Sequence, residues 1–244
     1  MDHRAGGWPA EGNRLPRTVS SGQILVIGES IVDIVSRDGF AAEHPGGSPL
    51  NVAVGLGRLG EDVRLLTSLG YARRGQLIRD HLRRSSVILD PATVTTSGTS
   101  TATAVLSENG AASYEFDISW NIPLGVQARP AAIVHTGSLA IALTPGHGAV
   151  LNLIQSSRER SLITVDANIR PTTGDQREAQ IAIAENFFAE TDIVKMSDED
   201  AEWLYPGLSG EDVATRLLAK TAVLVIITRG AAGSTCRASS SWQG

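Results

Sequence analysis

A glycine-rich turn leads into a helix pattern at Gly46-Gly47-Ser48-Pro49-Leu50-Asn51-Val52-Ala53, and Gly60 and Gly70 follow it at fixed spacing. Ser48 is a residue type that caps helices, and Pro49 suits a first helical turn. Apolar residues then recur at helical spacing until Gly60, which predicts the end of the helix. We therefore expect a strand-to-helix turn here, with its backbone open on one side.

The same turn has the chemistry of a hydroxyl-binding site. Two adjacent glycines, Gly46 and Gly47, let the backbone approach a ligand closely. Asn51, one turn into the helix, offers both a donor and an acceptor to a hydroxyl group. Taken alone, these residues favour an ordinary loop in which the glycines only make the turn, and a hydroxyl-binding site stays open as the alternative.

Around this turn, short apolar runs alternate with helical patterns, which is typical of an α/β fold. We expect a doubly wound, mostly parallel sheet with helices on both faces, and 244 residues can form it as one domain. The predicted strands are 24–27, 31–35, 63–69, 133–136, 162–166, 192–196 and 223–228. The predicted helices begin at Ser48, cover 76–84, follow Thr144-Pro145, cover 176–189, begin at Asp198 and cover 211–219.

One stretch departs from this alternation. Residues 101–106 and 113–118 are two alternating runs joined by Glu108-Asn109-Gly110, a strong signal for a β-hairpin. An antiparallel hairpin inserted into a parallel α/β chain is typically part of an accessory sheet, and here it could be a small antiparallel β lid over a site at the strand ends. An ordinary edge hairpin is the alternative.

Composition narrows the class of protein. The chain has 21 basic and 26 acidic residues, a net charge of −5 and no basic stripe, so we expect no nucleic-acid partner. Its one cysteine, Cys236, cannot form an internal disulfide, which fits a cytoplasmic protein. Residues 1–22 are polar and broken by glycine and proline, so we expect a disordered tail or a mispredicted start, and no membrane segment.

The stretch from Gly46 to Gly70 resembles the first signature of the ribokinase-like (PfkB) sugar kinases at every fixed position. The resemblance covers roughly residues 24–235, and the variants are most like those of bacterial fructokinases. It implies a ribokinase-like domain at 23–235, with lid strands within about 31–45 and 101–118. Its further segments are Gly28-Glu29 with Asp33, His135–Leu139, Asp166–Arg170, Lys195–Asp200 and Thr228–Gly233.

The resemblance implies a sugar-binding site made of Asp33, Gly46, Gly47, Asn51, Asn168 and Arg170. A carboxylate such as Asp33 can accept two hydroxyl protons, although a solvated acid at a strand end is the alternative. Asp166, Asn168 and Arg170 alternate along the chain, so we expect their side chains to point the same way from the end of a strand. A plain polar loop would also explain them.

The resemblance further implies that ATP and Mg²⁺ are the cofactors. It assigns Thr228, Gly230, Gly233 and Lys195 to the nucleotide, and Asp200 to the hydrated metal. Asp200 is one carbon shorter than the glutamate usual in the family. The pair Ser197 and Asp200 also matches a helix capping box, so a cap and a metal contact are both open.

Family members carry a second signature, DTxGAGD, which supplies an anion hole and the aspartate base. This segment does not occur in residues 1–244. Because residues 234–244 are polar and show no strand pattern, we interpret 236–244 as a tail outside the family pattern, produced by truncation or a frameshift. We expect apolar surface near 223–227 to be exposed, and no catalytic base, and therefore little or no kinase activity.

The leading hypothesis is an ATP-dependent, fructokinase-like sugar kinase that acts on a small-molecule sugar and could form a homodimer through the lid. A non-catalytic sugar-binding remnant or regulator is the alternative. A nucleotide-dependent oxidoreductase is disfavoured because no phosphate-binding fingerprint follows the first strand. Fructose, 2-keto-3-deoxygluconate, ribose and nucleosides all remain candidate substrates.

Overall fold

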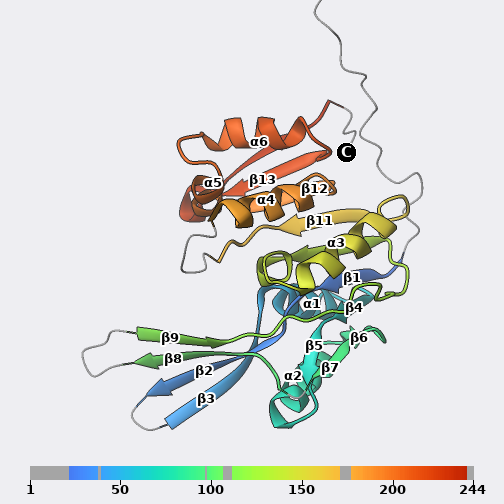
Figure 1. The fold of residues 1–244 in the computed structure, drawn as a ribbon, viewed down its shortest axis with the longest axis vertical. Helices are drawn as coiled ribbons and strands as arrows, with labels where there is room; N and C mark the ends of the chain where they lie inside the picture. Colours follow the sequence, from blue (N-terminus) through green and yellow to red (C-terminus); the bar gives the residue numbers. More distant parts are fainter. Residues whose placement is uncertain (1–21, 38–39, 97, 107–111, 171–176, 241–244) are drawn as a thin grey trace, which may run out of the picture.

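A computed structural model describes residues 22–37, 40–96, 98–106, 112–170 and 177–240 (Figure 1). Apart from Gly22, the predicted tail lies outside the described residues, and so does the predicted turn Glu108-Asn109-Gly110. No helix within the described ranges is both long and apolar enough to span a membrane.

A large sheet forms the centre of the molecule, and its strands are parallel except for β14. This confirms the predicted parallel α/β fold. The order across the sheet is β14 (Ser234–Ala238), β13 (Leu224–Thr228), β12 (Ile193–Ser197), β11 (Leu162–Asp166), β10 (Ile133–Gly137), β1 (Ile24–Ile27), β4 (Val63–Leu66) and β6 (Ile88–Leu89). The helices are α1 (Ser48–Arg58), α2 (Arg73–Arg84), α3 (Gly146–Ser157), α4 (Arg177–Phe188), α5 (Asp198–Leu204) and α6 (Gly210–Leu218), with 3₁₀ turns η1 (Ser138–Ile141) and η2 (Gly230–Ala232).

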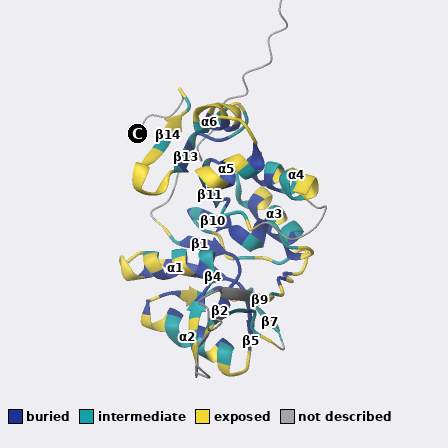
Figure 2. Ribbon diagram, turned by 90° about the vertical axis from the view of Figure 1, so that its left-hand side faces the viewer, coloured by how far each residue is buried: buried dark blue, intermediate teal, exposed yellow. Residues whose placement is uncertain are grey.

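Helices cover both faces of the sheet because neighbouring strand residues point to opposite sides. In β1, Ile24 and Val26 pack in a cluster with buried residues of α1 and α2. Leu25 and Ile27 belong to the other cluster, which holds the apolar residues of α3, α4, α5 and α6. Figure 2 shows the buried residues in dark blue, between the sheet and the helices on its two faces.

A separate four-stranded sheet projects from the main one (Figure 1). Its order is β3 (Phe40–Gly46), β2 (Ile31–Arg37), β8 (Thr101–Leu106) and β9 (Ala112–Asp117). β8 and β9 pair antiparallel, which confirms the predicted hairpin strands, while β2 and β8 pair in parallel. Two chain segments that are far apart in sequence therefore build one lid sheet.

The prediction of a single strand over 63–69 was wrong. The chain forms β4 and then β5 (Ser68–Gly70), which pairs with β7 (Val94–Thr96) in a small sheet of its own. β4 lies between β1 and β6 in the main sheet. β1 ends at Ile27 before the chain turns into the lid, and β6 ends at Leu89. Beyond Leu66 that edge offers no partner, so the chain pairs elsewhere.

The predicted cap at Ser48 was also wrong. Gly47 is the N-cap residue of α1, with φ 105°, and it makes no side-chain capping bond. The left-handed conformation suits glycine, and a Cβ there would lie 2.7 Å from the carbonyl oxygen of Glu29. The predicted place of Pro49 in the first turn and the predicted end of the helix before Gly60 are both confirmed.

Residues 234–238 form a strand, β14, where the sequence predicted none. β14 is an edge strand with mostly exposed side chains, so it shows no apolar alternation, and backbone hydrogen bonds to β13 hold it. The predicted exposure of residues 223–227 was wrong for Val223, Val225 and Ile227, which are buried. Leu224 and Ile226 point to the opposite face and are half-buried.

Candidate functional site

The carboxyl ends of the parallel strands meet at one edge of the sheet, where open α/β folds bind ligands. β10, β11, β12 and β13 end at Gly137, Asp166, Ser197 and Thr228. β1 ends at the same edge, and the lid strand β2 begins four residues later at Ile31. Every residue that the sequence analysis assigned to a site lies at this edge or on the segments leaving it.

Asp33 lies on the lid strand β2, against the glycine turn. Its carboxylate is so close to Gly46 that a Cβ on Gly46 would lie 2.0 Å from Asp33 Oδ2. Glycine is therefore required at position 46 for Asp33 to keep this place. Burial raises the pKa of Asp33, and the nearby charge of His44 acts in the opposite direction. A half-buried carboxylate beside an open backbone turn is suited to accepting hydroxyl protons.

Gly47 and Asn51 continue the turn into α1. The Asn51 amide donates to the Gly47 carbonyl at 2.9 Å, which starts the helix, and the Asn51 side chain is exposed. The fold thus brings together three of the predicted sugar-binding residues, Asp33, Gly46 and Gly47, and Asn51 lies one helical turn away.

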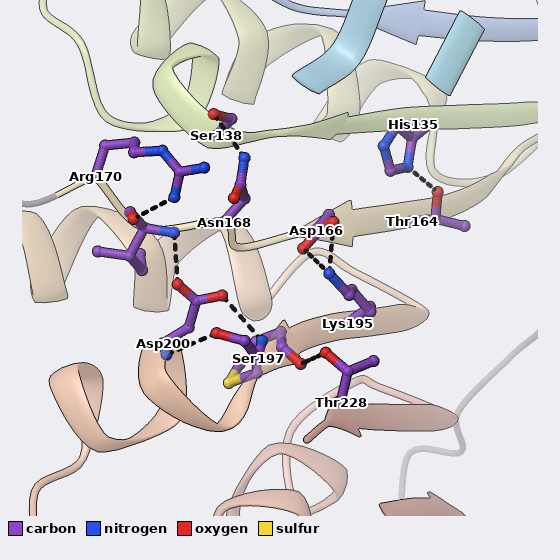
Figure 3. A network of polar contacts seen from close by, with 12 residues as sticks. His135, Ser138, Thr164, Asp166, Asn168, Arg170, Lys195, Ser197, Asp200 and Thr228 are labelled. Atoms are coloured by element: carbon purple, nitrogen blue, oxygen red, sulfur yellow. Dashed lines mark hydrogen bonds and ion pairs between the residues drawn. The ribbon is translucent and has the colours of Figure 1, made fainter. Parts of the chain in front are cut away.

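Asn168 and Ser138 connect the ends of β11 and β10. Asn168 Nδ2 donates to Ser138 Oγ at 3.1 Å (Figure 3). Both residues have positive φ, 38° for Asn168 and 57° for Ser138, which is uncommon for residues other than glycine. Each such conformation costs on the order of 1–3 kcal/mol and clusters at functional sites.

The prediction that the side chains of Asp166, Asn168 and Arg170 point the same way is wrong. β11 ends at Asp166, and the positive φ of Asn168 breaks the extended backbone, so the three side chains find different partners. Asp166 binds Lys195 Nζ at 2.9 and 3.1 Å, whereas Arg170 is exposed and donates to the Ile169 carbonyl at 2.9 Å (Figure 3).

The Asp166 and Lys195 ion pair lies on one face of β11 and β12, near the half-buried His135. Burial raises the pKa of Asp166, and the Lys195 ammonium acts in the opposite direction. His135 is 2.8 Å from Thr164 Oγ1 through Nδ1, and burial together with the Lys195 charge lowers the His135 pKa to about 4. His135 is therefore neutral near pH 7, and Lys195 supplies the positive charge here.

Asp200 forms a capping box at the start of α5, as one of the two interpretations of Ser197 and Asp200 predicted. Asp200 Oδ2 accepts from the Ser197 amide at 2.9 Å, and the Asp200 amide donates to Ser197 Oγ at 3.0 Å. Asp200 Oδ1 accepts from the Ile169 amide at 2.8 Å. Both carboxylate oxygens thus hold backbone amides, and the side chain joins the ends of β11 and β12 (Figure 3).

Replacing Asp200 with alanine should lower the free energy of unfolding by about 1–3 kcal/mol, because a helix cap and a buried amide partner are lost together. Urea denaturation followed by circular dichroism would measure this change. Glu199→Ala is the control, because Glu199 is an exposed acid in the same helical turn. Equal stability of the two variants would contradict the assigned role of Asp200.

Thr228 ends β13 and leads into a tight turn. Thr228 Oγ1 donates to the Met196 carbonyl at 3.4 Å, a long bond that leaves the hydroxyl free to reorient. Gly230 and Gly233 have φ of 51° and 86°, and the Arg229 amide donates to the Gly233 carbonyl at 2.7 Å. The turn places backbone amides and one hydroxyl at the sheet edge, and such groups suit phosphate oxygens.

Sequence reasoning underrated Glu29 and Ser138. Glu29 is 3% exposed, and its Oε2 accepts from the Ala140 amide at 3.1 Å. Burial raises its pKa to about 7. Both residues lie in segments that carried the family resemblance, but they are 109 positions apart, and their contact follows only from the pairing of β1 with β10. Among the described residues, no group of three or more His, Cys, Asp or Glu side chains could hold a metal ion.

Comparison with known proteins assigns the family. The model of the pfkB family carbohydrate kinases matches residues 22–241. The chain belongs to the pfkB family of carbohydrate kinases. The match confirms the resemblance inferred from the Gly46 to Gly70 signature and extends through β14. This pfkB chain is therefore a sugar kinase by family.

Fructokinases are prominent among its relatives. The chain is 30% identical to the fructokinase of Rhizobium leguminosarum bv. trifolii over 226 residues, which are 86% of this chain and 68% of the relative. It superposes on the ATP-bound fructokinase of Xylella fastidiosa with a TM-score of 0.73 at 21% identity, over 88% of this chain and 74% of that one. It superposes on the Vibrio cholerae O395 fructokinase with bound fructose, ADP and calcium with a TM-score of 0.74 at 20% identity, over 91% of this chain and 75% of that one.

Proposed function

We propose that this pfkB protein is fructokinase-like and that its sheet edge binds a sugar and ATP for transfer of the γ-phosphoryl group to a sugar hydroxyl. One observation carries the proposal. A continuous series of contacts runs along the edge from Asp33 through Gly46 and Gly47 to Glu29, then to Ser138 and Asn168, and finally through Asp200 and Ser197 to the end of β12 beside Thr228.

The lid end of this series would bind the sugar. Asp33 would accept hydrogen bonds from two hydroxyl groups of the sugar, and Gly46 and Gly47 leave space for the sugar ring beside the backbone. Asn51 is exposed and could add a donor and an acceptor. Asn168 and the exposed Arg170 would close the sugar site from the β11 side. The fructose in the Vibrio relative supports fructose as the first sugar to test.

The β12 and β13 end would bind the nucleotide. Thr228, Gly230 and Gly233 offer a hydroxyl and amides to phosphate oxygens. Lys195 has three N–H groups. Two of them donate to the two carboxylate oxygens of Asp166, so one remains for a phosphate. ATP in the Xylella relative and ADP in the Vibrio relative support a nucleotide as the second ligand.

The described residues fit Mg²⁺ less well than they fit a nucleotide. Both oxygens of Asp200 already accept amide hydrogen bonds, so Asp200 could reach a hydrated ion only through its remaining lone pairs. We therefore propose Asp200 only as an outer contact to water on the metal, and no step of transfer is assigned to it. Mg²⁺, when bound with ATP, would neutralise phosphate charge during transfer.

A thermal-shift assay tests the proposal directly. Fructose, ribose and 2-keto-3-deoxygluconate are each added to the purified chain, with and without ADP and Mg²⁺. We expect the melting temperature to rise with at least one sugar, because a ligand that binds only the folded state stabilises it by mass action. NAD is the control and should give no shift. Stabilisation by NAD alone would contradict the proposal and favour a dehydrogenase.

A non-catalytic sugar-binding protein is the second candidate. It is favoured by the engagement of Asp166 with Lys195 and of Asp200 with two amides, which leaves neither acid free. Sugar binding without turnover would select this function. A cytoplasmic location and a homodimer through the lid edge strands β3 and β9 complete the proposal.

A further inference from the structure

Glu29 has a buried carboxyl group that belongs to neither the proposed sugar site nor the proposed nucleotide site. It follows β1 directly, is 3% exposed and lies beneath the sheet edge. Its Oε2 accepts from the Ala140 amide at 3.1 Å, and the Ser138 side chain and the Leu139 amide also bond to the carboxyl. The carboxyl therefore holds the whole first turn of η1, which follows β10.

The backbone of the same segment supports the glycine turn. A Cβ on Gly47 would lie 2.7 Å from the Glu29 carbonyl oxygen, so the two backbones are in direct contact. A Cβ on Gly28 would lie 2.2 Å from Pro49, in the first turn of α1. Any movement of the 28–29 segment would consequently move the start of α1 and the Gly46 and Gly47 turn.

The η1 side of Glu29 is held in an uncommon conformation. Ser138, which bonds to the carboxyl, has φ 57° and accepts a hydrogen bond from Asn168, which has φ 38°. Two neighbouring residues in sparsely populated conformations persist only when their surroundings hold them. Glu29 is the buried group that touches this pair on one side and the glycine turn on the other.

We propose that Glu29 is a positioning residue that sets the distance between the Gly46 and Gly47 turn and the Ser138 and Asn168 pair, and so controls the affinity for sugar. This inference rests on the proposed function, because these two elements form the two sides of the proposed sugar site. Glu29 itself touches no substrate; it acts through η1 and through Asn168.

The ionisation of Glu29 gives this role a measurable signature. Burial raises its pKa to about 7, and no charged side chain of the described part of the chain contributes to that shift. The groups that face the carboxyl are neutral: the amide of Glu29 itself, the Ser138 hydroxyl and the amides of Leu139 and Ala140. Ionised, Glu29 holds these donors by stronger, charge-assisted bonds, so the site is best ordered above pH 7.

Affinity and stability should therefore respond to pH in opposite directions. The folded-state pKa is raised, so the stability contributed by Glu29 is full below about pH 4.5 and is lost as pH rises through about 7. Sugar binding favours the ionised form and should tighten about two- to fivefold between pH 6 and pH 8, which corresponds to a pKa change of roughly 0.5–1 unit on binding.

The experiment measures the dissociation constant of fructose by tryptophan fluorescence from pH 6 to pH 8, for the parent and for Glu29→Gln. Glutamine can accept from Ala140 but does not ionise, so we expect a pH-independent affinity equal to that of the parent at pH 6. Asp192→Asn is the matched control. Asp192 is also a buried carboxyl that accepts from an amide, that of Ile163 at 2.7 Å, but it lies at the opposite end of the strands.

Asp192→Asn should keep the parent profile, even if it lowers the melting temperature. A Glu29→Gln variant with the parent's pH dependence, or a parent whose fructose affinity does not change with pH, would overturn the role of Glu29 and leave the proposed function intact. A parent that binds none of fructose, ribose and 2-keto-3-deoxygluconate at any pH would contradict the proposed function, and the inference with it.

Discussion

Replacing Asp33 with alanine should weaken sugar binding by about 10²–10⁴-fold, which removes any sugar response within practical concentrations. Hydrogen bonds to a charged group contribute roughly 1.5–3 kcal/mol each, and this carboxylate can accept two hydroxyl protons. Asp33 is half-buried and lies against Gly46, so no solvent-exposed side chain can take its place there. Isothermal titration with the sugar selected by the thermal-shift assay would measure the loss.

Two further variants make this test specific. Asp117→Ala removes an exposed carboxyl from another strand of the same lid sheet and should leave sugar affinity unchanged. Asn51→Ala should weaken binding less than Asp33→Ala, and a circular-dichroism melt separates this from destabilisation. Burial raises the pKa of Asp33, so its carboxylate becomes protonated earlier as the pH falls. Sugar binding by the parent should therefore be lost, on acidification, at a higher pH than a site with an ordinary aspartate would lose it. Parent-like affinity in Asp33→Ala would remove Asp33 from the site.

Residues 1–244, assayed alone, should release no ADP in a sugar-dependent manner. In the family resemblance the base and the anion hole come from a DTxGAGD segment, and this segment is not among the 244 residues. General base catalysis contributes roughly 10²–10⁴-fold and an oxyanion-type site about 10²–10³-fold, so the expected loss is on the order of 10⁴-fold or more.

The structure adds a reason why the acids that are present should not replace that base. A base must come within hydrogen-bond reach of the proton that it removes. Asp166 is ion-paired with Lys195, and Asp200 holds the amides of Ser197 and Ile169. Releasing either carboxylate would break contacts that join neighbouring strands, so neither is free to move to a substrate hydroxyl.

A chimera tests this expectation. Residues 1–244 are extended by the final segment of the Rhizobium fructokinase, and ADP release is coupled to NADH oxidation with fructose, ribose and 2-keto-3-deoxygluconate. The chimera should turn over, and a second chimera with DTxGAGN in place of DTxGAGD should not. Sugar-dependent turnover by residues 1–244 alone would show that a base lies among the residues present.

The sequence by itself determined the class of fold and the family. Apolar runs such as Ile24–Ile27 are local signals, because a buried parallel strand must be apolar along its whole length. The turn from Gly46 to Asn51 is also local, since close backbone approach demands glycine whatever surrounds it. The predicted lid hairpin follows from alternation over 101–106 and 113–118, which is again a property of neighbouring residues.

Only the tertiary structure decided which distant segments pair and which side chains meet. β14 forms because β13 offers an unpaired backbone edge, and backbone hydrogen bonds leave no mark on side-chain pattern. The split at Leu66 follows from where β1 ends, not from residues 63–69 themselves. Glu29 meets Ser138 and Ala140 because β1 and β10 are neighbours, and that pairing sets which buried polar groups satisfy one another at the site.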